Sequence, residues 1–316
     1  MSIRLNSWPI WLKKFNRHDD QVGCAVRTDD INSGGQEAPN SIKKQLEWAT
    51  KTLFSISCSA GLDSEVLLAF CLQKNRTYLL TWPERELTID QLECFQDLIR
   101  KRLQPQPVAY LIGSREFYSM ELNTTPSTLV PRPETELIVD TVLDLITDID
   151  SPKILEMGTG TGAIALALKK YQPESNLLAT DISQQALEVA RSNADKHDLN
   201  VSFLESNWYQ HVAPGKFDVI VSNPPYIAAD DPYLSQGDLP AEPLMALSSG
   251  ETGLEALEII IQGAENYLNN SGWLVLEHGY NQQVQVTEML VKYGFCNVKT
   301  LKDFNELPRV SLGSRK

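Results

Sequence analysis

The stretch Ile154-Leu155-Glu156-Met157-Gly158-Thr159-Gly160-Thr161-Gly162 decides the fold of this chain. Its first four residues are mostly apolar and predict a short buried strand. The three glycines that follow let the backbone turn tightly and approach a ligand closely. A helical pattern over residues 163–170 comes next. A strand, a glycine loop and a helix in this order are typical of the first βα unit of a nucleotide-binding sheet.

Strand-like runs alternate with helical segments in the rest of the chain. This alternation predicts right-handed βαβ crossovers and a doubly wound, mostly parallel, seven-stranded α/β sheet of the Rossmann-like type. Ligands of such sheets bind beyond the carboxyl ends of the strands. We expect strands at 154–157, 177–180, 201–204, 217–222 and 273–277, two closing strands at 298–301 and 309–312, and helices at 163–170, 183–197 and 253–268.

The first 131 residues have a different character and predict three further regions. Residues 1–40 show no sustained period and are expected to be a flexible N-terminal extension. Residues 41–113 carry helical periods, with Asn40-Ser41 and Thr88 as helix starts, and predict a small helical domain. Residues 114–131 predict a connecting hairpin with strands at 115–122 and 127–130. The Rossmann-like domain then covers residues 132–316, and its first helix is expected at 134–146.

The charge of the chain argues against some partners. The 316 residues include 28 basic and 41 acidic ones, a net charge of −13. Such a chain is a poor candidate for unspecific binding to nucleic acid or anionic lipid, because both carry the same sign. Residues 201–250 contain one basic residue, Lys216, and six acidic ones. The segment therefore does not predict a surface for a phosphate backbone.

The cysteines and the apolar runs indicate a cytoplasmic protein. The five cysteines are odd in number and never form a CxxC pair, so we expect reduced thiols rather than disulfides or a structural zinc site. No apolar run approaches the roughly 18–20 residues of a membrane span. The apolar run near the start of the chain is too short for a signal peptide, and the residues on either side of it are too polar.

The glycine loop and a downstream carboxylate predict a cofactor site. Asp181 ends the strand after the loop, 23 residues beyond Gly158. A carboxylate at this point can accept hydrogen bonds from both hydroxyls of a ribose. The spacing Gly158-x-Gly160-x-Gly162 differs from the dinucleotide pattern and is weak evidence on its own. Together with Asp181 it predicts an adenosine-cofactor site, without separating NAD from S-adenosylmethionine. A glycine turn with a capping aspartate and no ligand is the simpler alternative.

A second loop, Asn223-Pro224-Pro225-Tyr226, follows the expected strand at 217–222. Two consecutive prolines remove two backbone donors and fix two φ angles, so the loop is rigid. The Asn223 side chain and the carbonyls of Asn223 and Pro224 are left as acceptors at the mouth of the sheet. Tyr226 offers an aromatic face beside them. A plain turn is the structural alternative.

This loop suits transfer of a methyl group to a planar nitrogen. The lone pair of an amide or exocyclic amine is delocalised, so such a nitrogen is a poor nucleophile. Acceptors that bind its N–H groups can hold it with the lone pair directed at an electrophilic methyl group, and catalysis is then mainly positioning and electrostatics. No strong base is needed before attack. Accordingly, none of the four histidines is expected to be catalytic.

The two loops together resemble those of S-adenosylmethionine-dependent amino-methyltransferases, which act on adenine in DNA, guanine in rRNA or glutamine in proteins. Further motifs make the chain similar to the HemK/PrmC family of release factor glutamine methyltransferases from about residue 41 to residue 316. They are Pro107-Val108-Ala109-Tyr110-Leu111-Ile112-Gly113, Arg115-Glu116-Phe117, Arg132-Pro133-Glu134-Thr135-Glu136, Glu242-Pro243, Ala246-Leu247 and Leu276-Glu277-His278-Gly279.

The resemblance implies a class I methyltransferase fold, a role for each site residue, and no metal. Asn223 and the Pro224 carbonyl would accept hydrogen bonds from the substrate amide, with Pro225 and Tyr226 shaping the slot. Asn223 would also touch the cofactor. The remaining cofactor residues would be Gly158, Thr159, Gly160, Thr161 and Gly162 at the methionine and ribose end, Glu156 toward the ammonium, Asp181 on the ribose and Trp208 beside the adenine.

The resemblance also implies the reaction and the partner. The enzyme would methylate the glutamine N5 in the Gly-Gly-Gln motif of class-1 peptide chain release factors and so promote translation termination, acting as a monomer with no direct contact to nucleic acid. The alternatives are an amino-methyltransferase for adenine or guanine, and a binding module without turnover. Gly34-Gly35-Gln36 repeats the substrate motif within the chain itself. A chance linker sequence is preferred over self-docking.

Overall fold

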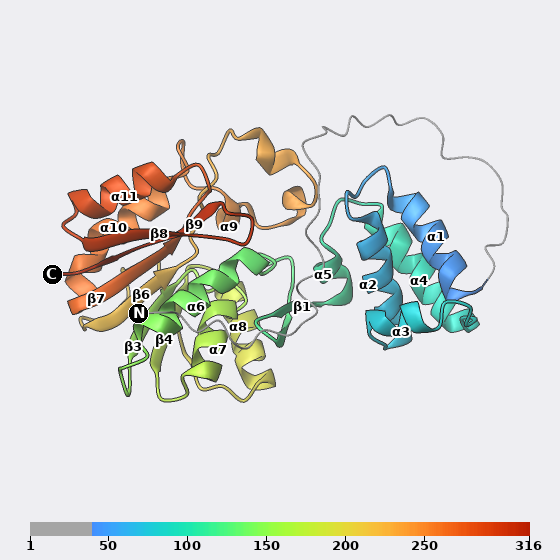
Figure 1. The fold of residues 1–316 in the computed structure, drawn as a ribbon, viewed down its shortest axis with the longest axis horizontal. Coiled ribbons are helices and arrows are strands. Elements are labelled where there is room, and N and C mark those ends of the chain that lie inside the picture. Colours follow the sequence, from blue (N-terminus) through green and yellow to red (C-terminus); the bar gives the residue numbers. More distant parts are fainter. Residues whose placement is uncertain (1–39) are drawn as a thin grey trace. The chain divides into compact units, whose positions relative to one another are not determined.

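The computed structural model describes residues 40–316 (Figure 1). The predicted extension, with its Gly34-Gly35-Gln36 tripeptide, lies outside the described residues apart from Asn40. The described chain begins with five helices. They are α1 (Ile42–Leu53), α2 (Ala60–Leu72), α3 (Arg76–Thr81), α4 (Ile89–Arg102) and α5 (Val108–Ile112).

These helices share an apolar core of their own, to which α2 contributes Leu67 and α4 contributes Phe95. The predicted start of α4 is confirmed. Thr88 Oγ1 accepts a hydrogen bond from the Gln91 N–H, and the Gln91 side chain accepts one from the Thr88 N–H, so the two residues form a capping box. The sequence did not predict α3 and α5, because six and five residues are too few for a helical period to show.

The hairpin that follows is formed by β1 (Ser114–Phe117) and β2 (Met120–Asn123). The prediction of its second strand at 127–130 was wrong, because those residues form no strand. The turn lies earlier, at Tyr118-Ser119, where φ is 49° and 57°. Two positive φ angles are typical of a type I′ hairpin loop, which usually contains Asn or Gly. Because Tyr118 and Ser119 are neither, the turn could not be predicted from the sequence.

The remainder of the chain forms a seven-stranded sheet of order β5-β4-β3-β6-β7-β9-β8. The first five strands in this order pair in parallel, and β9 is antiparallel to both of its neighbours. The predicted doubly wound, mostly parallel Rossmann-like sheet is thus confirmed. The strands are β3 (Lys153–Met157), β4 (Asn176–Asp181), β5 (Ser202–Glu205), β6 (Phe217–Ser222), β7 (Leu268–Glu277), β8 (Cys296–Lys302) and β9 (Pro308–Ser314).

Helices cover both faces of the sheet (Figure 1). Ile154 of β3 packs in one apolar core with α6 (Glu136–Leu145), α7 (Ala163–Tyr171) and α8 (Gln184–Lys196). Its neighbour Leu155 packs in a second core, with α10 (Glu255–Tyr267) and α11 (Gln283–Lys292). Successive strand residues point to opposite faces. The near-continuous apolar runs of the central strands follow from this burial on both sides.

Several shorter elements went unpredicted. They are α11, the one-turn helix α9 (Leu244–Leu247), and the 3₁₀ turns η2 (Pro133–Thr135), η3 (Pro232–Ser235) and η4 (Leu239–Ala241). In α11 only Val286 and Leu290 are buried, so its apolar stripe is narrow. None of the helices in residues 40–316 is long and apolar enough to cross a membrane. The four cysteines of this range are free thiols, and the sulfur atoms of Cys71 and Cys94 lie 2.7 Å apart.

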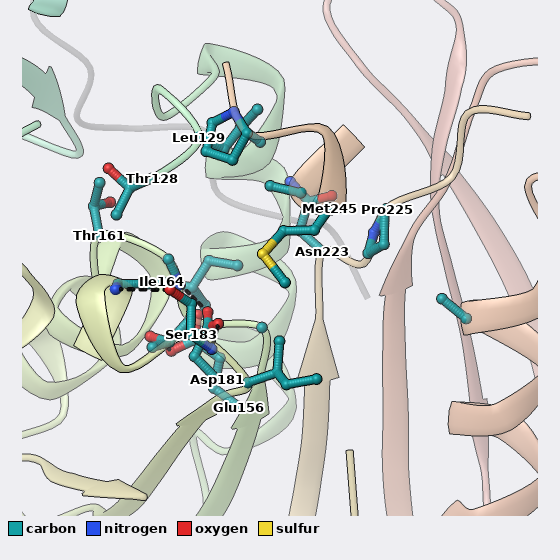
Figure 2. A pocket seen from close by; sticks show the side chains of 18 of the residues that line it. Thr128, Leu129, Glu156, Thr161, Ile164, Asp181, Ser183, Asn223, Pro225 and Met245 are labelled. Carbon is teal, nitrogen blue, oxygen red and sulfur yellow. Dashed lines mark hydrogen bonds between the residues drawn. The ribbon is translucent and has the colours of Figure 1, made fainter. Parts of the chain in front are cut away.

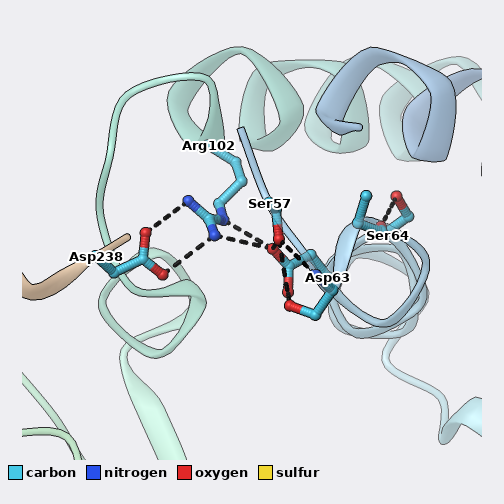
Figure 3. A network of polar contacts seen from close by, with 7 residues as sticks. Ser57, Asp63, Ser64, Arg102 and Asp238 are labelled. Atoms are coloured by element: carbon cyan, nitrogen blue, oxygen red, sulfur yellow. Dashed lines mark hydrogen bonds and ion pairs between the residues drawn. The ribbon is translucent and has the colours of Figure 1, made fainter. Parts of the chain in front are cut away.

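A buried ion-pair network joins α4 to the loop after β6 (Figure 3). Arg102 is 3% exposed, and its Nε donates to Oδ2 of Asp63 in α2 at 3.0 Å. Its Nη1 and Nη2 donate to the two carboxylate oxygens of Asp238, at 2.9 and 3.1 Å. The hydroxyls of Ser57 and Ser59 also donate to Asp63. Arg102 therefore fixes the loop that carries Asp238 to the N-terminal helices α2 and α4.

Candidate active site

A cavity of about 380 Å³ opens at the carboxyl ends of β3 and β6, where the strand order of the sheet reverses (Figure 2). This is the position at which doubly wound sheets bind their ligands, and the volume lies in the range of small-molecule sites. Most of the predicted site residues line this one cavity. They are Glu156, Gly158, Thr159, Gly160, Thr161, Asp181, Trp208, Asn223 and Pro225.

The glycine loop forms one wall of the cavity. Gly158, Gly160 and Gly162 have φ of 72°, 56° and 83°, a region that residues with a Cβ rarely adopt. A Cβ on Gly160 would meet nothing within 4 Å, so this glycine borders open space. A Cβ on Gly162 would instead lie 3.3 Å from the Ala190 methyl group, and Gly162 does not line the cavity. Gly160 thus leaves room for a ligand, whereas Gly162 serves the packing of α7 on α8.

Glu156 lies at the base of this loop and is 1% exposed. Burial raises the pKa of its carboxyl to about 8, and a hydrogen bond from Thr159 acts in the opposite direction. That bond runs from Thr159 Oγ1 to Glu156 Oε2 over 2.7 Å. At neutral pH the carboxyl is therefore largely protonated, and a cation placed beside it would favour its ionised form.

Asp181 lies next to the glycine loop, at the end of β4. Its Oδ2 accepts the Gly160 N–H and its Oδ1 accepts the Ser183 N–H, each at 2.9 Å. Burial raises the pKa of this carboxyl, and the two backbone donors oppose the rise. Each carboxylate oxygen can accept more than one hydrogen bond, so Asp181 retains acceptor capacity for a pair of ligand hydroxyls.

Trp208 follows β5 and adopts a φ of 50°, unusual for so large a residue. Its carbonyl accepts a hydrogen bond from Ser206 Oγ at 2.8 Å, and Ser206 Oγ in turn accepts the His211 N–H. The Ser206 N–H donates to the Asp181 carbonyl. These contacts fix the unusual backbone, and the indole lines the cavity.

The Asn223–Tyr226 loop forms the other wall. Asn223 and Pro225 line the cavity, whereas Pro224 is buried and Tyr226 is not part of the lining. The Tyr226 hydroxyl donates to Glu277 Oε1 at 3.3 Å. The Tyr226 carbonyl accepts a hydrogen bond from Gln282, and a Cβ on Gly253 would come within 2.5 Å of this carbonyl. Tyr226 thus does not line this cavity, and its hydroxyl contacts Glu277, the partner of the Thr135 hydroxyl that Asn223 also contacts. Its expected part in shaping the substrate slot stays a prediction.

Two residues to which the sequence assigned no role are linked to Asn223 by hydrogen bonds, and one of them, Thr135, also lines the cavity. Asn223 Nδ2 donates to Thr135 Oγ1 at 3.1 Å, and Thr135 Oγ1 donates to Glu277 Oε2 at 2.8 Å. Thr135 and Glu277 are 5% and 1% exposed. Both belong to motifs that the sequence analysis had noted, Arg132–Glu136 and Leu276–Gly279. The motifs marked these residues as part of the family resemblance but did not indicate their contact with Asn223. Apolar lining from Leu129, Ile182, Met245 and Ile259 was likewise not predicted.

Family models match both parts of the chain. The model for the PrmC N-terminal domain matches residues 44–113, and the model for the methyltransferase small domain matches residues 134–235. Among solved structures, the hMettl16 catalytic domain in complex with MAT2A 3′UTR hairpin 6 has a TM-score of 0.50 and 17% identity, covering 63% of this chain and 77% of that one. This likeness concerns the fold alone.

Relatives of assigned activity match over almost their whole length. The release factor glutamine methyltransferase of Shewanella oneidensis is 42% identical over 273 residues, which cover 86% of this chain and 95% of the relative. The release factor glutamine methyltransferase of Aliivibrio fischeri is 44% identical over 259 residues, covering 81% and 91%. The Rossmann-like sheet, with the glycine loop and the Asn223–Tyr226 loop at one cavity, agrees with membership of the same family. At this identity and coverage of the relatives, the chain belongs to the release factor glutamine methyltransferase family.

Proposed function

We propose that this enzyme transfers a methyl group from S-adenosylmethionine to the side-chain nitrogen N5 of the glutamine in the Gly-Gly-Gln motif of class-1 release factors. The observation that carries the proposal is the shared cavity: a cofactor cradle after β3 and the Asn223 amide after β6 line the same space. The relatives' name supports the choice of a release factor as substrate.

The residues of the cavity fit the cofactor. Gly160 leaves the space in which the methionine and ribose would lie, and Asp181 keeps acceptor capacity for the ribose hydroxyls. The Trp208 indole offers a flat apolar surface for the adenine, and Glu156 is a buried carboxyl that would face the ammonium. When bound, S-adenosylmethionine supplies an electrophilic methyl group on a sulfonium, a good leaving group.

The chain's own contribution to the reaction is positioning. Asn223 Oδ1, at the cavity wall, and the carbonyl of Pro224, a role assigned by the family resemblance, would accept the two N–H groups of the substrate amide and so direct the nitrogen lone pair at the methyl carbon. In this transfer the N–C bond would form as the S–C bond breaks, and the nitrogen would then lose a proton to water. The products are N5-methylglutamine and S-adenosylhomocysteine. No residue has to remove a proton before attack.

Transfer to adenine or guanine of nucleic acid is the competing function. It requires a surface for a phosphate backbone, and residues 201–250, which include the reactive loop, hold one basic residue against six acidic ones. We therefore favour a protein substrate. We further propose that the helical segment 41–113 docks the release factor, and that the enzyme acts as a cytoplasmic monomer without a metal.

Labelled cofactor tests the substrate directly. With purified release factor, DNA and rRNA as acceptors, label is expected only in the release factor, and a release factor whose motif glutamine is replaced by alanine should stay unlabelled. Label in nucleic acid alone would overturn the proposal.

Asn223→Ala tests the proposed site. Loss of the side-chain acceptor should lower kcat about 100-fold or more, because a poor nucleophile loses its orientation. Cofactor affinity, measured by calorimetry, should change only a few-fold. The exposed Asn200→Ala serves as control and should retain full activity. Full activity of Asn223→Ala would remove this residue from the mechanism.

A further inference from the structure

Asn223 is the first member of a short chain of buried hydrogen bonds. Its Nδ2 donates to Thr135 Oγ1, and Thr135 Oγ1 donates to Glu277 Oε2. The three residues come from separate parts of the fold: the loop after β6, the turn η2 before α6, and the end of β7. Burial of polar groups costs free energy unless they are hydrogen-bonded, so the bonds of the buried Thr135 and Glu277 side chains are what make these polar residues tolerable there.

The direction of these bonds follows from the chemistry of the groups. An ionised carboxylate can only accept, so Glu277 takes the single hydroxyl proton of Thr135. Thr135 then presents a lone pair to Asn223, which suits the amide NH₂ group. If the Asn223 amide were flipped, its oxygen would face that lone pair, and two acceptors would oppose each other. The NH₂ group therefore stays on Thr135, and Oδ1 is left for another donor.

We infer that Thr135 and Glu277 are positioning residues for methyl transfer, which fix the Asn223 amide so that Oδ1 is presented to the N–H of the substrate amide. The inference rests on the proposed function of Asn223. An asparagine without this support could present its NH₂ group to the substrate, where two donors would meet and the substrate amide would not be held.

The surroundings of Glu277 set the pH range in which this arrangement holds. Burial raises the pKa of Glu277 to about 7, against the effect of the Thr135 and Tyr226 hydroxyls and the Arg309 guanidinium. Glu134 in η2 adds a small rise, and the pKa of the adjoining His278 is lowered by burial. Above about pH 7 the carboxylate accepts both hydroxyl protons. Below it, a protonated Glu277 can donate to Thr135, whose hydroxyl is then free to donate to a flipped Asn223 amide.

Substitution of Thr135 separates the hydroxyl from the shape of the side chain. Thr135→Val removes the hydroxyl and should lower kcat with release factor about 10- to 100-fold, by analogy with the loss seen when the hydrogen-bond partners of metal ligands are removed. Thr135→Ser keeps the hydroxyl and should restore kcat to within about threefold. Cofactor affinity should be similar in both. Thr141→Val is the matched control, because that buried hydroxyl donates only to the Leu137 carbonyl within its own helix.

The pH profile tests Glu277. At saturating cofactor and release factor, kcat of the wild type should fall as the pH drops below about 7. In Glu277→Gln the side chain does not titrate, so this fall should vanish, and kcat should be reduced at pH 8. A fall at low pH that persists unchanged in Glu277→Gln would overturn the role of Glu277.

The two proposals fail in different ways. If the wild type transfers no methyl group to the release factor glutamine, the proposed function is wrong. If the wild type is active and Thr135→Val is as active as Thr135→Ser, the proposed function stands and the positioning role is wrong.

Discussion

Gly160 and Gly162 lie two positions apart and share a left-handed backbone, but only Gly160 borders the open cavity. Gly160→Ala should weaken cofactor binding at least tenfold, since its methyl group would enter the ligand space. Gly162→Ala should mainly lower stability, because its methyl group would press on Leu166 and Ala190. Calorimetric titration and urea unfolding separate the two effects. Equal loss of cofactor affinity in both variants would contradict the division of roles.

Glu156 makes the stability of the free enzyme depend on pH. Its pKa is about 8 in the folded chain and near 4.5 when unfolded, so between these values the folded state binds more protons. Stability should then fall as the pH rises from about 5 to 8, by on the order of 1 kcal/mol per pH unit from this group. Glu156→Gln should flatten the slope. Unfolding by urea at pH 5.5 and 7.5 measures it, with Glu188→Gln, at an exposed helix position, as control.

At the scale of elements, the β1–β2 hairpin carries a local strain that can be relieved. Ser119 is exposed and has a φ of 57°, which costs a residue with a Cβ roughly 1 kcal/mol. Ser119→Gly should therefore raise the free energy of unfolding by about 0.5–1 kcal/mol. Ser119→Ala keeps the Cβ and should give no gain. Equal stability of the two variants in urea would show that the turn is not strained.

Some elements of this fold could be predicted from the sequence and others could not. The central strands were predictable because burial on both faces leaves apolar runs, and the glycine loop was predictable because positive φ angles favour glycine. The hairpin was misplaced because Tyr118 and Ser119 hold positive φ angles without glycine or asparagine. The Thr135–Glu277 contact joins residues 142 positions apart, and no local period or spacing reports such a pair.

At the scale of the molecule, Arg102 connects the helical segment to the loop that carries Asp238 (Figure 3). Arg102→Ala should cost about 3 kcal/mol, because it leaves the nearly buried Asp63 carboxylate without a cation. Asp238→Asn should cost only about 1 kcal/mol, since this side chain is 30% exposed and its amide can still accept from Arg102. Urea unfolding measures both, and a larger loss for Asp238→Asn would contradict the network.

The sheet order makes one strand responsible for two contacts. β8 precedes β9 in the chain, yet it joins the sheet only through β9. The same strand β9 pairs Val310 with Glu277 and so delivers Arg309 to the neighbourhood of that carboxylate. The glycine loop and Asp181 follow β3 and β4, whose pairing involves neither β8 nor β9. Displacement of β9 would therefore take a cation from the surroundings of Glu277 and leave the pairing of β3 with β4 in place.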